Sequence, residues 1–65
     1  MSNTKKKYLS KIESGDKIWI ANAFITILRM WRHQNGKTTI EVWLNHKHVK
    51  MTYNNSREFE VYVEN

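Results

Sequence analysis

The chain has 65 residues, with 11 Lys or Arg against 6 Asp or Glu, and carries a formal net charge of +5 at pH 7. A domain of this size buries only about 60% of its unfolded surface, and the absence of cysteine excludes a disulfide framework or a thiolate zinc site. A partner subunit is then the remaining source of extra stability. The excess of basic charge favours a polyanionic partner through counterion release, and the lack of cysteine fits the cytoplasm.

Residues 1–7 are polar and basic, with Lys5, Lys6 and Lys7 in succession. No apolar segment follows them, so they are not a signal peptide, and no stretch of the chain approaches transmembrane length. We expect a flexible basic tail over residues 1–7, either solvated or in contact with nucleic acid. Residues 8–65 are then a single small β domain, with no membrane partner.

The rest of the chain alternates between β-rich runs and turn residues. We predict strands over residues 8–11, 17–20, 24–32, 38–44, 48–53 and 59–63, which are rich in β-branched and aromatic residues. In the run 48–53 the apolar and polar side chains alternate cleanly, which is typical of a half-buried strand. The pattern predicts an all-β fold, a small antiparallel sheet or barrel of five to six strands.

Asn35-Gly36 divides the two longest runs and supplies the positive φ angles of a type I′ turn. If these two are the loop residues, Trp31 lies opposite Ile40 and Met30 lies opposite Glu41. Trp31 and Trp43 then point to opposite faces of the hairpin.

An α+β fold is the alternative. Apolar residues between positions 17 and 33 also fit a helical stripe, and Gly36 would then follow the end of the helix. In that case one helix over residues 17–33 packs on a three-stranded antiparallel sheet. The succession Ile25, Thr26 and Ile27 disfavours the helix, because β-branched residues lose rotamer freedom in it.

The candidates for chemistry are few. His33, His46 and His48 supply imidazoles but no spaced fourth ligand, so we expect no metal site. No nucleophile–base pair and no glycine-rich phosphate loop is present. We therefore expect neither an enzyme nor a cofactor.

Aromatic residues are the more informative candidates. Trp19, Trp31 and Trp43 lie on three successive predicted strands, so at least one tryptophan is expected on the outer face. An apolar outer face indicates either a dimer interface or a platform on which single-stranded bases stack.

Three segments are similar to a known family. Leu9-Ser10-Lys11, then Gly15-Asp16-Lys17-Ile18-Trp19-Ile20, then Phe24-Ile25-Thr26-Ile27-Leu28 resemble the carbon storage regulator (CsrA/RsmA) family of RNA-binding translational regulators. The likeness covers about two-thirds of the chain, from Leu9 to Met51, by residue class more than by identity.

This resemblance implies a homodimer of interleaved strands that occludes single-stranded RNA near a translation start. The RNA-binding residues it implies, from the first strand and around the fifth, are Leu9, Ser10, Lys11, Lys47, His48 and Lys50, with Arg57 displaced by a few positions. Lysines would hold the phosphates, and backbone groups would read the splayed bases.

A function of another class stays open. A small basic β domain can be a protein-binding module or an inhibitor that docks on a host enzyme or regulator. Its aromatic hot spot would consist of Trp19, Trp31, Trp43 and Tyr53.

Overall fold

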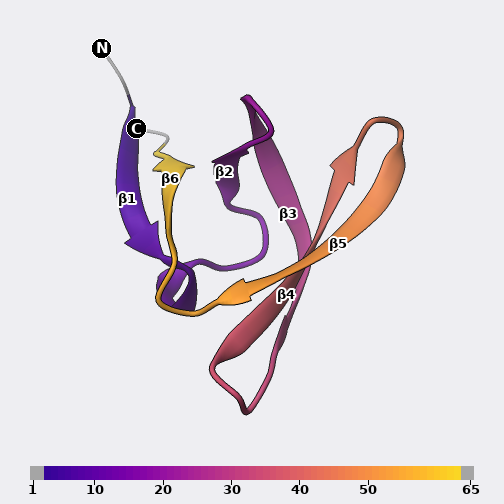
Figure 1. Ribbon diagram of the computed structural model, residues 1–65. Coiled ribbons are helices and arrows are strands. Elements are labelled where there is room, and N and C mark those ends of the chain that lie inside the picture. The colour runs from indigo at the N-terminus through magenta and orange to yellow at the C-terminus, as the bar shows by residue number, and fades with distance from the viewer. Residues whose placement is uncertain (1–2, 64–65) are drawn as a thin grey trace.

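A computed structural model describes residues 3–63, which form six antiparallel strands in one sheet of order β1-β6-β2-β3-β4-β5 (Figure 1). The elements are β1 (Thr4–Tyr8), the 3-10 turn η1 (Leu9–Lys11), β2 (Lys17–Ile20), β3 (Ala23–Arg32), β4 (Lys37–Leu44), β5 (Lys47–Asn54) and β6 (Glu58–Tyr62). The predicted all-β fold is confirmed. The alternative helix over residues 17–33 is wrong, because those residues form β2 and the whole of β3. No helix in the described residues is long and apolar enough to cross a bilayer.

Strand β3 pairs with a different strand at each end and so connects the two halves of the sheet. Its first residues pair with β2, in the register Ile18↔Ile25, and its last residues pair with β4. The register shifts between Ile27 and Arg29, which leaves Leu28 as an extra residue in a β-bulge. We call β3, β4 and β5 the meander, and β1, β6 and β2 the terminal half, since it holds both ends of the described chain (Figure 1).

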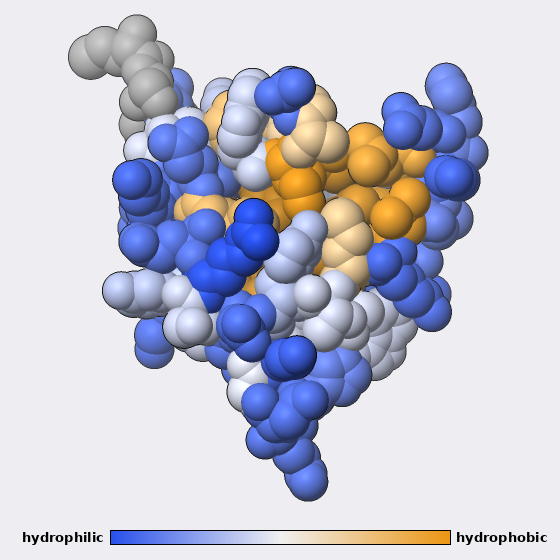
Figure 2. Space-filling model, viewed as in Figure 1, coloured by the Kyte–Doolittle hydropathy of each residue, from blue (hydrophilic) through white to orange (hydrophobic). Residues whose placement is uncertain are grey.

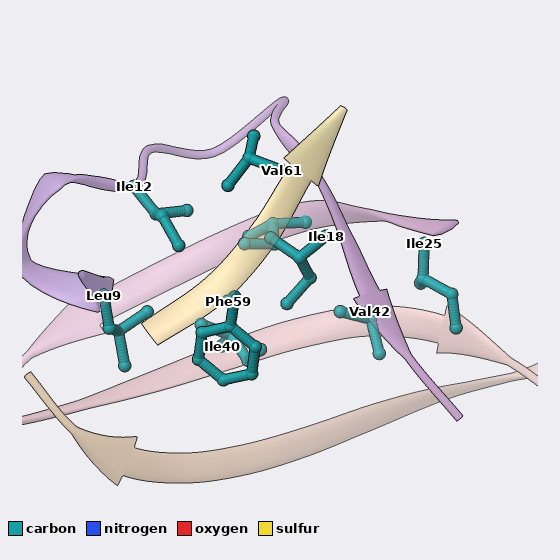
Figure 3. Close-up of a cluster of buried hydrophobic side chains, with 9 residues drawn as sticks. Leu9, Ile12, Ile18, Ile25, Ile40, Val42, Phe59 and Val61 are labelled. Atoms are coloured by element: carbon teal, nitrogen blue, oxygen red, sulfur yellow. The ribbon is translucent and has the colours of Figure 1, made fainter. Parts of the chain in front are cut away.

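The core lies between the two halves. Alternate side chains of both turn inward, as expected for a sheet with one buried face. The buried residues are Leu9, Ile12, Ile18, Ile25, Ile27, Ile40, Val42, Phe59 and Val61 (Figure 3). Figure 2 shows that apolar surface continues from this core into the hollow between the halves. Both halves therefore depend on one shared core.

Hydrogen bonds from the Arg32 side chain connect η1 to the end of the meander. Its guanidinium donates to the carbonyl oxygens of Leu9 at 2.9 Å and Ile12 at 2.6 Å, and to Thr38 Oγ1 at 3.1 Å. Thr38 is fully buried and donates its own hydroxyl proton to Asn55 Oδ1 at 2.5 Å. Two nitrogens of the planar guanidinium share these three acceptors, and the single nitrogen of a lysine ammonium does not match this spread.

The β3–β4 hairpin differs from the predicted one. The His33 N–H donates to the Lys37 carbonyl at 2.9 Å, so the loop holds the three residues 34–36 and not two. Within this loop only Gly36 has a positive φ, of 80°. Trp31 consequently lies opposite Thr39, and the predicted register is wrong.

Two-residue loops with the backbone expected of a type I′ turn occur at the other two hairpins of the sheet. Ala21 and Asn22, between β2 and β3, have φ of 54° and 64°. Asn45 and His46, between β4 and β5, have φ of 52° and 64°. Both pairs connect strands with the right-handed twist that this turn matches.

The N-terminal segment is more ordered than the sequence suggests. Residues 4–7, expected in a flexible tail, belong to β1, and residues 9–11, expected in a strand, form η1. β1 pairs with β6, which places Lys6 opposite Glu60. Opposite charges across a strand pair favour this pairing, although the segment has little apolar surface of its own. Met1 and Ser2 lie outside the described residues.

Candidate nucleic-acid interface

The outer face of the meander combines aromatic and basic side chains. Residues opposite each other in antiparallel strands point to the same side of the sheet, so the register forms rows across the meander. One row holds Trp31, Thr39 and Thr52, the next holds Arg29, Glu41 and Lys50, and the last holds Trp43 and His48. We call these eight residues the outer face.

The two tryptophans lie on this same face, which corrects the prediction that they point to opposite faces. The bulge at Leu28 and the three-residue loop together change which residues of β3 face outward. Trp31 is 37% exposed and Trp43 is 51% exposed. The rows that hold them are four residues apart along β4, a separation of about 13 Å.

Each tryptophan contacts a nitrogen-bearing side chain of β5. The Lys50 ammonium lies 5.0 Å from the centre of the Trp31 ring, a cation–π contact. His48 packs edge to face on Trp43, with ring centres 5.0 Å apart. These contacts limit the rotation of the rings and place a cation beside an aromatic surface.

Polar groups lie beside Trp31 and in the row between the two tryptophans. Thr39 Oγ1 lies 2.7 Å from both His33 Nε2 and Thr52 Oγ1, and His48 Nδ1 lies 3.1 Å from Glu41 Oε2. The Glu41 side chain is only 14% exposed, and Arg29 and Lys50 lie opposite it in the register. Its single negative charge is therefore surrounded by basic groups.

Of the predicted RNA-binding residues, the structure brings His48 and Lys50 together on the outer face. Lys47 begins β5 and is exposed, opposite Leu44. Leu9 is fully buried. Its side chain belongs to the core, where it supports η1 and does not reach solvent.

The remaining predicted residues lie around η1. Leu9 N–H donates to the Arg57 carbonyl at 2.8 Å, so η1 and the β5–β6 connection are neighbours within one chain. Ser10 lines a shallow open depression there with Tyr8, Asn55 and Ser56, and Lys11 is exposed. The Arg57 guanidinium stacks 4.6 Å from the ring centre of Tyr53, which is half-buried. Arg57 and Tyr53 thus cover the core edge.

Trp19, the third tryptophan, belongs to a separate aromatic cluster that involves the terminal half. Its ring packs edge to face on Phe24 at 5.0 Å, and Phe24 packs on Tyr62 at 5.8 Å. The Lys17 ammonium lies 5.8 Å from the Tyr62 ring centre. Phe24 and Tyr62 in this cluster, and Arg29 on the outer face, were not among the site residues predicted from the sequence.

The alternation of Trp43, Glu41 and Thr39 along β4 is the one signal that could have placed Glu41 beside Trp43. Arg29 has no such signal, because the bulge before it is not visible in the sequence. Among residues 3–63 no three side chains of His, Cys, Asp or Glu gather into a possible metal site.

No protein-family model and no curated protein matches the chain.

Proposed function

We propose that this protein binds single-stranded RNA on the outer face of the meander. The observation that carries the proposal is the presence of two exposed tryptophans on one face, with Arg29 and Lys50 in the row between them. Aromatic rings stack on bases with little regard to sequence, and basic side chains bind the phosphates that link those bases.

Each element of the face has a role in this interaction. Trp31 and Trp43 are the stacking surfaces, and Lys50 and Arg29 neutralise phosphates between them. The hydroxyls of Thr39 and Thr52, together with the ring of His33, which lies next to the face and contacts Thr39, hydrogen-bond base edges or the ribose 2′-hydroxyl. The mechanism is occlusion without covalent chemistry: RNA bound near a translation start is covered, and the protein acts as a repressor of translation.

The test is fluorescence anisotropy with a labelled mixed-sequence single-stranded RNA, on the full chain and on Trp31→Ala and Trp43→Ala. Loss of one stacking surface costs roughly 1–3 kcal/mol, about a 5- to 150-fold rise in Kd. Trp19→Ala removes the same side chain from the terminal half and is the matched control, with an unchanged Kd expected. Equal Kd values for all three variants and the parent chain would refute this site.

Salt separates RNA binding from the second candidate function, docking on a protein. The cluster of Trp19, Phe24 and Tyr62 favours that candidate, because it lies beside Lys6 and Glu60 on a face of mixed charge. Aromatic anchors are enriched in protein interfaces. RNA affinity should fall steeply as salt rises, whereas an aromatic-centred protein interface should change little.

A further inference from the structure

The sheet has two edges, β1 and β5, and they differ in their protection against pairing. β1 carries Lys5, Lys6 and Lys7 in five residues. Two copies paired through β1 about a two-fold axis at Lys6 would place lysine opposite lysine at every one of these positions. Lysines on an edge strand are a known protection against such pairing.

β5 is longer, with eight residues, and its charges are sparser. Its side chains alternate between half-buried Val49, Met51 and Tyr53 and exposed His48, Lys50 and Thr52. Asn55 N–H donates to the Gly36 carbonyl at 2.9 Å, which continues the β4–β5 ladder. Hydrogen bonding alternates along an antiparallel pair, so the backbone groups of positions 48, 50 and 52 point to the open edge.

We propose that β5 pairs with β5 of a second copy, antiparallel, about a two-fold axis at Met51. In this register Lys50 lies opposite Thr52 of the partner subunit, and His48 lies opposite Asn54 of the partner subunit. Val49 meets Tyr53 of the partner subunit on the other face. Seven residues of each strand pair, apolar side chains face apolar side chains, and no like charges are opposed.

Two other registers are less favourable than the one with its axis at Met51. A two-fold axis at Lys50 opposes Lys50 to Lys50 of the partner subunit. A shift of one residue would place Lys50 opposite Met51 of the partner subunit, which sets a polar side chain against an apolar one across the pair. Pairing of β5 with β1 of another copy would bring Lys47 and Lys50 towards three lysines. The contact therefore closes as a dimer and does not grow into a filament.

This dimer joins the two outer faces into one surface. The proposal does not rest on RNA binding, because it follows from strand order, side-chain alternation and charge alone. It can be measured without any nucleic acid.

The experiment is sedimentation equilibrium of the full chain at protein concentrations up to about 1 mM, where even contacts of Kd near 1 mM are visible. We expect a monomer–dimer equilibrium. Thr52→Lys opposes two pairs of lysines across the axis and should raise the dimer Kd roughly 2- to 30-fold. Thr52→Glu creates two Lys–Glu pairs and should lower it.

Two further variants fix the register. Combining Lys50→Glu with Thr52→Lys creates two Glu–Lys pairs across the axis. The dimer Kd should then be equal to or lower than that of the parent chain. Ser56→Lys adds the same charge outside the paired segment and should leave Kd near the parent value. A parent chain that stays monomeric at all concentrations would refute the dimer. A response to Thr52→Lys and Thr52→Glu in the same direction would refute this register.

Discussion

The two halves of the sheet use aromatic residues in different ways. In the cluster that involves the terminal half, Trp19 and Tyr62 both pack on the ring of Phe24, and acidic Glu58 and Glu60 lie among the lysines of β1. In the meander, Trp31 and Trp43 contact Lys50 and His48 instead, and Glu41 is the only acidic residue between positions 23 and 54.

This difference shows that exposed aromatic area alone does not define a binding surface. All three tryptophans are exposed to a similar degree, from 37% to 51%. What distinguishes Trp31 and Trp43 is the chemistry of their neighbours: rings that pack on other rings stabilise the fold, and rings set among cations can accept a base and its phosphate.

The largest expected effect is a loss of stability, and it tests whether the two halves of the sheet unfold together. Ile40→Ala in the meander and Ile18→Ala in the terminal half each empty a fully buried position of the shared core. Each should lower the free energy of unfolding by about 2–5 kcal/mol in a single cooperative transition, measured by urea denaturation. Two separate transitions, or loss of only one half, would show that the halves fold independently.

A smaller effect is expected at the contact between the halves. Arg32→Lys keeps the charge but removes the planar fork that bonds Leu9, Ile12 and Thr38. We expect a loss of about 2 kcal/mol in unfolding free energy, because a charged hydrogen bond contributes about 1.5–3 kcal/mol and an ammonium recovers part of this. Arg29→Lys, on the outer face, is the matched control and should change stability by less than about 0.5 kcal/mol. Equal losses for the two variants would contradict the role given to Arg32.

Two exposed lysines, Lys50 and Lys11, are both predicted from the sequence to bind RNA, and comparing them tests where on the protein the RNA binds. Lys50→Gln removes a phosphate contact from the outer face and should reduce the slope of log K against log salt by about 1. Lys11→Gln, on η1, should leave the slope unchanged. Anisotropy titrations at several salt concentrations give both values. A larger change in slope for Lys11→Gln than for Lys50→Gln would place the RNA-binding site at η1 and not on the meander.

The smallest effect compares the two type I′ loops. Ala21 holds φ of 54° without the local hydrogen bonding that helps asparagine adopt it, and Asn45 holds φ of 52°. Ala21→Asn should raise the unfolding free energy by about 0.5–1 kcal/mol, and Asn45→Ala should lower it by a similar amount. Thermal unfolding followed by circular dichroism measures both, and changes of the same sign for the two variants would mean that the two loops differ in backbone conformation.

The local patterns in the sequence predicted most strands, but not the faces of β3. Alternation located β2 and correctly separated His48, Lys50 and Thr52 from the half-buried residues of β5. It failed for Trp31, because a bulge and a third loop residue each change the parity of the strand, and no residue type signals either. β1 was missed because its pairing depends on distant Glu60 and not on its own composition.

The candidate site was therefore predicted in part. His48 and Lys50 came from the family resemblance and are on the outer face, and the tryptophans were identified as candidates. The arrangement of Trp31 and Trp43 on one surface was not foreseen, because it depends on the long-range register of β3 and β4. Leu9 was misplaced, since an apolar residue beside lysines gives no sign that the following turn directs it into the core.

Because Leu28 is an extra residue in the ladder, neither its side chain nor its presence is strongly constrained at this point of β3. Leu28 is 42% exposed, so many side chains fit there. Deletion of this one residue would make Ile27 and Arg29 neighbours, opposite the neighbouring Val42 and Glu41, so the β3–β4 ladder would become regular while Met30 and Trp31 keep their present faces. Among variants of this protein, position 28 should therefore accept nearly any amino acid and also tolerate its own removal.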